Sequence, residues 1–109
     1  MSEMTLREVC QNLGVSRRAV QGYEKAKLVS ASRKTDSGYL LYNTAARERI
    51  RQIKLFQDMG FTIKEITEII DAPADVKRTA LIIRKEQLAQ NIIHENAMLE
   101  IIQEMLSQL

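Results

Sequence analysis

The chain has 109 residues, which is enough for one domain with at most an appendage. Its single cysteine excludes an intrachain disulfide framework, and no apolar run approaches the roughly 20 residues of a membrane-spanning helix. The net charge of +2 is unevenly divided: residues 1–60 carry eleven Lys and Arg against six Asp and Glu, whereas residues 61–109 carry five against eight. This division indicates that the first half meets a polyanion, and the alternative is a chance spread of solvated charge. We expect a soluble, cytoplasmic protein without a signal peptide.

The first thirty residues predict two short helices joined by a tight turn. Thr5 and Glu8 have the spacing of a capping box, which predicts a helix that begins after Thr5 and ends at Gly14. Ser16 is a suitable N-cap for a second helix that continues to about Lys25. The apolar residues expected to face inward from these helices and their turns are Leu6, Val9, Cys10, Leu13, Val15, Ala19, Val20, Tyr23, Leu28 and Val29.

A β-hairpin is expected next, within residues 30–43. Its tip is predicted near Asp36-Ser37-Gly38, which is a turn signal, and residues 39–42 have strand character. The hairpin therefore follows the two helices directly, in the order of a helix-turn-helix with a wing.

Two further helices are predicted after the hairpin. A third helix, capped by Thr44 or Asn43, continues to Met59 and is stopped by Gly60. A second capping box, Thr62-Ile63-Lys64-Glu65, opens a short fourth helix. The side chains expected to face inward are Ile50, Ile53, Phe56 and either Leu55 or Met59 in the third helix, and Ile63, Ile66, Ile69 and Ile70 in the fourth.

A long helix is predicted over residues 76–109, after the break at Pro73. About 30 residues at 1.5 Å per residue give a length of roughly 45 Å. Its apolar stripe has a three–four spacing with polar interruptions at Lys85 and Glu95, and such a stripe predicts a second copy of the chain as partner. The alternative is a helix folded back on its own domain. The stripe consists of Leu81, Leu88, Ile92, Leu99, Ile102, Leu106 and Leu109.

In their order and in their residues, these elements resemble the MerR family of transcription regulators. The resemblance covers residues 5–70 in register and continues into the long helix, which is similar to the dimerising coiled coil of that family. The matching segments are Thr5-Leu6-Arg7-Glu8-Val9, Leu13-Gly14-Val15-Ser16, Arg18, Tyr23-Glu24, Leu28, Ser32-Arg33, Ser37-Gly38-Tyr39, Leu41-Tyr42 and Met59-Gly60-Phe61-Thr62-Ile63-Lys64-Glu65-Ile66.

The resemblance implies a mainly α fold with two domains. Residues 1–72 would form a winged helix-turn-helix DNA-binding domain, and residues 73–109 a dimerisation helix that pairs as an antiparallel coiled coil. It also implies a homodimer that binds a pseudo-palindromic operator in double-stranded DNA and regulates transcription by distorting promoter DNA, a form of indirect readout. RNA polymerase at the promoter is a further implied partner, and no membrane is implied.

The resemblance places the DNA contacts on the second helix and on the wing. Arg18 is the first choice for a base or phosphate contact, because a guanidinium bonds bidentately to guanine. The alternative for each exposed cation is a solvated surface charge. The expected DNA-binding residues are Ser16, Arg17, Arg18, Gln21, Tyr23, Arg33, Lys34, Tyr39 and Tyr42. The expected dimerisation residues are Leu88, Ile92, Leu99, Ile102 and Leu106.

Three positions depart from the family pattern. Gln21 and Gly22 stand where the family has Arg and Tyr, and Leu40 stands where its wing has Arg. Each missing phosphate contact would lower DNA affinity and its salt dependence, whereas Gln21 could instead read adenine. Altered specificity and loss of DNA binding both stay open, so the alternative function is a winged-helix protein-interaction module.

The residues offer no recognisable metal-sensing or catalytic motif. Metal-sensing members carry cysteines near the end of the dimer helix, but Cys10 is expected in the core and His94 has no second ligand nearby. Met98 and Met105 are expected to pack in the helix seam, and the alternative is a small apolar site between the paired helices. Because drug-sensing members append a ligand domain, either this member lacks a sensor or the sequence is part of a longer protein. We expect no metal, no cofactor and no enzymatic activity, since no recognisable motif pairs a nucleophile with a base.

Overall fold

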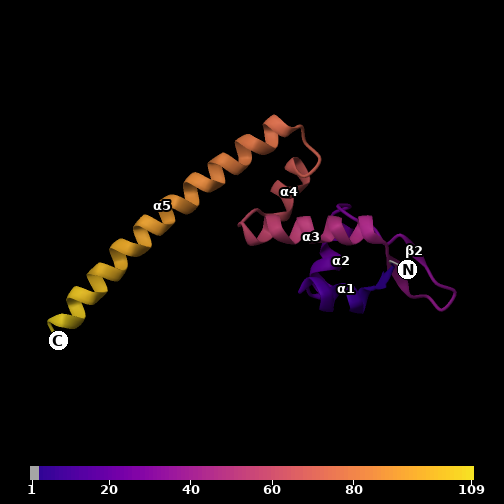
Figure 1. Cartoon of the computed structure of the whole chain (residues 1–109), viewed down its shortest axis with the longest axis horizontal. Coiled ribbons are helices and arrows are strands. Elements are labelled where there is room, and N and C mark those ends of the chain that lie inside the picture. The colour runs from indigo at the N-terminus through magenta and orange to yellow at the C-terminus, as the bar shows by residue number, and fades with distance from the viewer. Residues whose placement is uncertain (1–2) are drawn as a thin grey trace. The chain divides into compact units, whose positions relative to one another are not determined.

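A computed structural model describes residues 3–109 and shows two compact units, Met1–Asp71 and Ala72–Leu109. Within the described residues, the first unit contains three short strands and four helices, and the second contains one long helix (Figure 1). The elements are β1 (Met4–Thr5), α1 (Leu6–Leu13), α2 (Arg17–Lys25), β2 (Arg33–Lys34), β3 (Leu40–Tyr42), α3 (Thr44–Asp58), α4 (Ile63–Ile69) and α5 (Ala74–Ser107). The predicted winged helix-turn-helix followed by a long helix is confirmed.

Local side-chain caps begin four of the helices as predicted. Thr5 and Glu8 form both hydrogen bonds of a capping box at α1, and Thr62 and Glu65 do the same at α4. Asn43, one of the two predicted alternatives, caps α3 through its side-chain oxygen. These bonds satisfy backbone N–H groups that would otherwise have no partner at a helix start.

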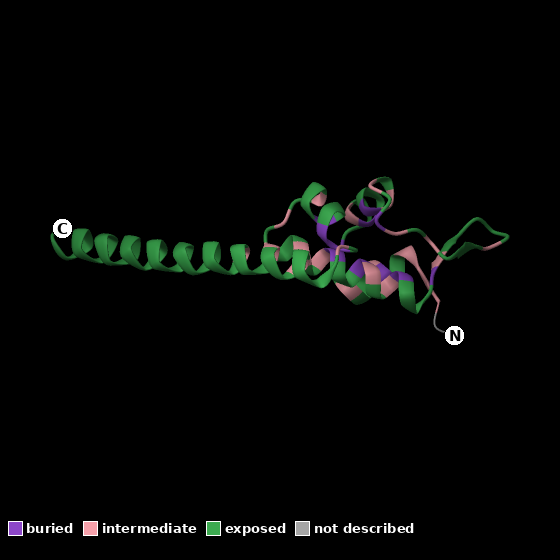
Figure 2. Ribbon diagram, turned by 90° about the horizontal axis from the view of Figure 1, so that it is seen from above, coloured by how far each residue is buried: buried purple, intermediate pink, exposed green. Residues whose placement is uncertain are grey.

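A small antiparallel sheet with strand order β1-β3-β2 connects the N-terminus to the wing. The register pairs Met4 with Tyr42, Thr5 with Leu41, Arg33 with Leu41, and Lys34 with Leu40. β1 was not predicted, because two residues show no strand periodicity. β3 begins one residue later than the predicted strand, and the turn at residues 36–38 lies where it was expected. The hairpin tip extends from the unit and is largely exposed (Figure 2).

The core of the first unit lies where α1, α2, α3, α4 and β3 meet (Figure 2). Aliphatic residues from all four helices pack around two buried tyrosines, Tyr23 and Tyr42. The buried members are Val9, Val15, Val20, Tyr23, Leu28, Tyr42, Ala46, Ile50, Ile53, Ile66 and Ile70. Of the two alternatives in α3, Met59 is half-buried and Leu55 is exposed, so Met59 is the inward residue.

The second unit is dominated by α5, which has 34 residues and none of them buried (Figures 1 and 2). It begins at Ala74, two residues earlier than predicted, because Pro73 is extended and occupies the N-cap position, where its missing N–H does no harm. The unit boundary lies after Asp71, whereas the predicted domain boundary lies after residue 72. Within the described residues, no helix is both long enough and apolar enough to cross a membrane.

Candidate nucleic-acid interface

The start of α2 is fixed by the predicted cap and by the turn before it. The Ser16 hydroxyl oxygen accepts a hydrogen bond from the backbone N–H of Ala19 at 2.9 Å. Gly14 ends α1 with a φ of 67°, a left-handed conformation that favours glycine. Arg17 and Arg18 then occupy the first turn of α2, which has no acidic residue.

One side of α2 is exposed and basic, and we refer to it as the α2 face. Its residues are Arg17, Arg18, Gln21, Gly22 and Lys25, all of which are exposed. They share one side because residues three and four positions apart are neighbours on a helix surface. The opposite side buries Val20 and Tyr23 in the core. The same burial that anchors α2 therefore turns its cations outward.

The cations of the α2 face differ from those of α3 in their partners. Within residues 3–109, the side chains of Arg17, Arg18 and Lys25 form no hydrogen bond or ion pair. The cations of α3, in contrast, form hydrogen bonds or ion pairs with other groups of the protein. Arg47 donates to the Tyr42 carbonyl oxygen, Arg49 to Asp71 and the Leu28 carbonyl oxygen, Arg51 to Glu48, and Lys54 to Asp58. The α2 face thus carries charge that the unit itself does not neutralise.

Two tyrosines predicted to contact DNA lie in the core instead. Tyr23 is 2% exposed and its hydroxyl donates to Gln57 Oε1 at 2.6 Å; Tyr42 is fully buried and donates to Glu24 Oε1 at 3.1 Å. Burial, and then the nearby charge of Asp58, raises the pKa of Tyr23. Burial, and then the Glu24 carboxylate, raises the pKa of Tyr42 well above its usual range. This placement corrects the expected direct contact, because large aromatic rings gain more from burial than from exposure.

These two hydrogen bonds position α2 between its neighbours. The Tyr23 bond connects α2 to α3, and the Tyr42 bond connects β3, the inner strand of the wing, to the C-terminal part of α2. α2 and the wing are therefore joined directly by the hydrogen bond between Tyr42 and Glu24. The helical spacing of Tyr23 with Ala19 and Val20 had correctly predicted that Tyr23 faces inward from α2.

The wing presents fewer free cations than the sequence predicted. Arg33 Nε donates to both carboxylate oxygens of Glu3, at 2.9 and 3.1 Å, whereas Lys34 is exposed and has no ion pair within the described residues. The Glu3–Arg33 pair was not predicted, because it depends on the pairing of β1 with β3. Tyr39 is 65% exposed and Leu40 is 37% exposed, so the tip of the wing is partly apolar.

The predicted dimerisation residues Leu88, Ile92, Leu99, Ile102 and Leu106 are all exposed on α5. We refer to them, with Leu81 and Leu109, as the α5 stripe. Cys10 is half-buried against the core of the first unit and His94 is exposed. Among residues 3–109, no three His, Cys, Asp or Glu side chains lie close enough together to hold a metal ion.

Comparison with known proteins matches the chain to a family of regulatory proteins. Residues 4–73 match the family described as MerR HTH family regulatory protein. The HTH-type transcriptional activator mta of Bacillus subtilis (strain 168) is 39% identical over 83 residues, which are 76% of this chain and 32% of that protein. The nodulation protein NolA of Bradyrhizobium sp. (strain NC92) is 33% identical over 64 residues, which are 59% of this chain and 27% of that protein. The chain thus spans a third or less of the length of these relatives.

Solved structures agree with this match. The N-terminal part of the Bacillus subtilis multidrug transporter activator, MtaN, superposes with a TM-score of 0.73 at 34% identity, over 94% of this chain and 97% of that one. HiNmlR, described as a MerR family regulator lacking the sensor domain and bound to promoter DNA, has a TM-score of 0.69 over 90% and 79% of the two chains. Its identity of 15% makes that likeness one of fold alone. Since the family match covers more than half of the chain, this protein belongs to the MerR HTH family of regulatory proteins.

Proposed function

We propose that this protein is a transcription regulator that binds double-stranded DNA sequence-specifically as a homodimer. The observation that carries the proposal is the α2 face, where Arg17, Arg18 and Lys25 are exposed and have no acidic partner within residues 3–109. The phosphates of a DNA duplex supply the negative charge that this surface lacks. Family membership supports the same function.

The positions of Arg17 and Arg18 are better explained by DNA binding than by a contribution to the stability of the fold. A helix N-terminus carries a partial positive charge, so each exposed cation in the first turn costs roughly 0.3–1 kcal/mol of stability. The other short helices follow the favourable pattern, with Glu8 in the first turn of α1 and Glu65 in that of α4. An unfavourable local choice with no compensating contact is typical of a binding site. The same N-terminus also favours a bound phosphate.

The α2 face has groups suited to reading bases in the major groove. Arg18 can bond bidentately to guanine, and Gln21 can bond bidentately to adenine. Gly22 is unusual, because an added Cβ would meet no atom within 4 Å and its φ is not left-handed. Neither packing nor backbone conformation requires glycine there. We infer that Gly22 lets the backbone of α2 approach the DNA closely.

In this proposal the wing contacts the DNA backbone beside the groove. Lys34 and Tyr39 are exposed and available for phosphate contacts. Arg33 would exchange Glu3 for a phosphate, and the exchange costs little, because an ion pair with side chains 60% and 31% exposed contributes at most about 1 kcal/mol. Tyr23 and Tyr42 would act indirectly, by holding α2 against α3 and the wing.

The α5 stripe is the proposed dimer interface, and the charges within it favour antiparallel helices. Lys85 and Glu95 interrupt the stripe at core spacing. In a parallel, in-register pair each would face its own copy, so two like-charge contacts would lie in the seam. An antiparallel pair avoids both. It attaches one winged-helix unit to each end, and its two-fold symmetry matches a pseudo-palindromic operator.

The proposed action is distortion of promoter DNA. Two α2 faces held by one helix pair must both reach the major groove, and the DNA can meet that requirement by bending. Bending costs about 1–6 kcal/mol, which the protein–DNA contacts repay. Such distortion would change how RNA polymerase uses the promoter. We place this activity in the cytoplasm.

A footprint on the DNA upstream of the protein's own gene tests the proposal. Protection of two half-sites related by two-fold symmetry is the expected result. If the folded dimer protects no sequence even at low salt, the protein does not have this function. Circular dichroism and sedimentation of the same sample establish that it is folded and dimeric.

The exposed tip of the wing favours one second candidate, a protein-interaction module. Tyr39 and Leu40 present apolar surface there, and Arg33 is already neutralised. Salt separates the two candidates: the logarithm of DNA affinity should fall steeply with the logarithm of salt concentration. A partner that stays bound after nuclease treatment, with no DNA binding at low salt, would favour the interaction module.

A further inference from the structure

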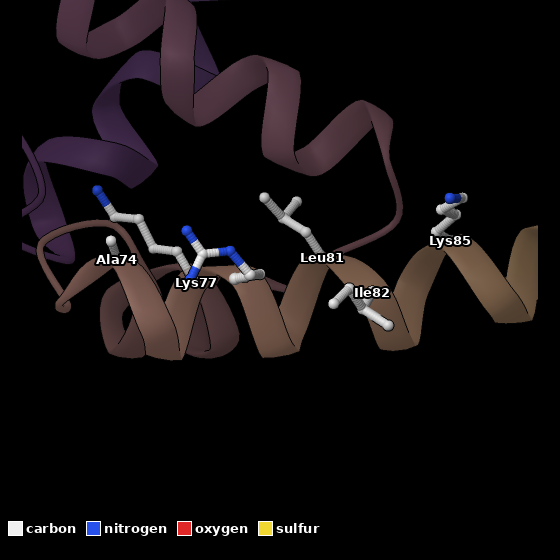
Figure 3. A pocket seen from close by; sticks show the side chains of 6 residues that line it. Ala74, Lys77, Leu81, Ile82 and Lys85 are labelled. Atoms are coloured by element: carbon white, nitrogen blue, oxygen red, sulfur yellow. The ribbon is translucent and has the colours of Figure 1, made fainter.

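Two charged residues occupy core positions of the α5 stripe. From Leu81 onward the stripe advances by four and three residues in turn, and Lys85 and Glu95 stand at positions where this spacing calls for apolar side chains. Figure 3 shows that Leu81 and Lys85 project from the same side of α5, one turn apart, while Ile82 points another way. Both charges are exposed, and neither has a hydrogen bond or ion pair within residues 3–109.

We propose that Lys85 and Glu95 form two symmetric ion pairs across the antiparallel α5 dimer and so determine its register. The proposal rests on the homodimer proposed above. In this register Leu81 faces the partner's Leu99, Lys85 faces the partner's Glu95, and Leu88 faces the partner's Ile92. Each charge therefore meets its opposite, and each leucine meets an aliphatic side chain.

Both neighbouring registers place Lys85 against an aliphatic side chain of the partner. Core positions repeat every seven residues, so the competing antiparallel registers differ by one heptad. One of them puts Lys85 against the partner's Ile102 and Glu95 against the partner's Ile92. The other puts Lys85 against the partner's Leu88 and pairs only Glu95 with an opposite charge, the partner's Arg78. A charge without a partner in a seam is costly to desolvate, so a single polar position is enough to specify register.

The length of α5 favours the same register. In the proposed pairing, residue 107 of one helix faces residue 73 of the other, so two helices spanning Ala74–Ser107 overlap along their whole length. The two competing registers restrict the overlap to residues 80–107 or to residues 74–99. Because apolar burial drives association, the longest overlap is the most stable. The pairing of charges and the length of the helix are independent arguments, and both favour the same register.

A shallow hollow on α5, which three cations help to line, fits the acidic end of the partner helix. The hollow has a volume of about 360 Å³ and is lined by Ala74, Lys77, Arg78, Leu81, Ile82 and Lys85 (Figure 3). In the proposed register the partner's Leu99, Ile102 and Leu106 lie over it. Residues 95–109 contain Glu95, Glu100 and Glu104 and no Lys or Arg, so the charges of the two segments are complementary.

A charge swap on the full-length chain tests the register. Lys85→Glu and Glu95→Lys each place like charges across both pairs, and we expect either change to raise the Kd of the dimer at least about tenfold, measured by sedimentation. The combined variant K85E/E95K restores both pairs and should return the Kd to within about threefold of the original. A mixture of the two single variants should form heterodimers, in which both pairs are again opposite in charge.

Cross-linking measures the register itself. In a Cys10→Ser background, a chain with Leu81→Cys is mixed with a chain with Leu99→Cys and treated with a short bismaleimide. The proposed register predicts a cross-linked heterodimer. If Leu81→Cys is instead joined to a chain with Leu106→Cys, the register is one heptad away and the proposal is wrong.

The outcomes separate this proposal from the proposed homodimer. A wild-type chain that sediments as a monomer contradicts the homodimer. A dimer whose Kd is the same in wild type, both single variants and the combined variant contradicts the Lys85–Glu95 pairing and leaves the homodimer intact.

Discussion

The substitution Gly22→Ala should make the protein more stable and its DNA binding weaker. Gly22 lies within α2, with no atom within 4 Å of an added Cβ and no left-handed φ. Alanine therefore fits without strain and reduces the backbone entropy lost on folding. In a helix interior this exchange is worth about 1 kcal/mol, which corresponds to a rise in Tm of about 4–8 °C for a domain of this size.

Gly14→Ala is the matched control for the stability measurement. Gly14 has a φ of 67°, so alanine there is strained and should lower the Tm. The two variants make the same chemical change and differ in backbone conformation. Both are compared with wild type by thermal unfolding at one protein concentration, because the Tm of a dimer depends on concentration.

DNA affinity is measured for the same Gly22→Ala protein by fluorescence anisotropy on the footprinted duplex. If the backbone of α2 approaches the DNA at Gly22, the added methyl group must push the helix outward and lower the affinity. A variant that is more stable but binds DNA as wild type does would show that Gly22 lies outside the interface. A variant that is less stable would refute the structural argument itself.

Three other predictions concern the fold and the dimer. Tyr42→Phe removes the hydroxyl that donates to Glu24 and should cost about 1–3 kcal/mol in the free energy of unfolding, measured with urea; an unchanged midpoint would mean that this bond contributes nothing. The backbone N–H of Thr5 lowers the pKa of Glu8, so the charged form stabilises the fold above pH 4.5 and this stabilisation is lost as the pH falls through the lowered pKa. Glu8→Gln should therefore flatten the dependence of Tm on pH below 4.5, and an identical acid profile would contradict this assignment. Leu99→Glu should give monomers by light scattering, and a mass of two chains would exclude the α5 stripe as interface.

Local features of the fold were predictable because their causes are local. The bonds of each capping box join residues three apart, so Thr5 with Glu8 and Thr62 with Glu65 indicated helix starts directly. Helical spacing likewise identified Tyr23 as an inward residue of α2, although the family pattern had also suggested that it contacts DNA.

Features that depend on contacts distant in sequence were missed. β1 consists of two residues, and only its pairing with β3, from Met4 to Tyr42, makes it a strand. The Glu3–Arg33 ion pair follows from that same pairing. The burial of Tyr42 depends on its side of β3, which a three-residue strand does not reveal by alternation. The division between engaged and free cations also depended in part on the fold, since the partners of Arg49, Leu28 and Asp71, lie 21 and 22 residues away in the sequence.

The salt dependence of DNA binding tests most directly the claim that the α2 face binds DNA. Anisotropy titrations on the footprinted duplex would compare wild type with Arg17→Ala/Arg18→Ala, and with Arg51→Ala as a control that removes a cation already paired with Glu48. We predict that log affinity falls linearly with log salt and that the control matches wild type. The double variant should bind more weakly, with a slope shallower by about 0.9 for each phosphate that the protein no longer neutralises. A folded dimer whose affinity and slope are unchanged in the double variant would contradict the account.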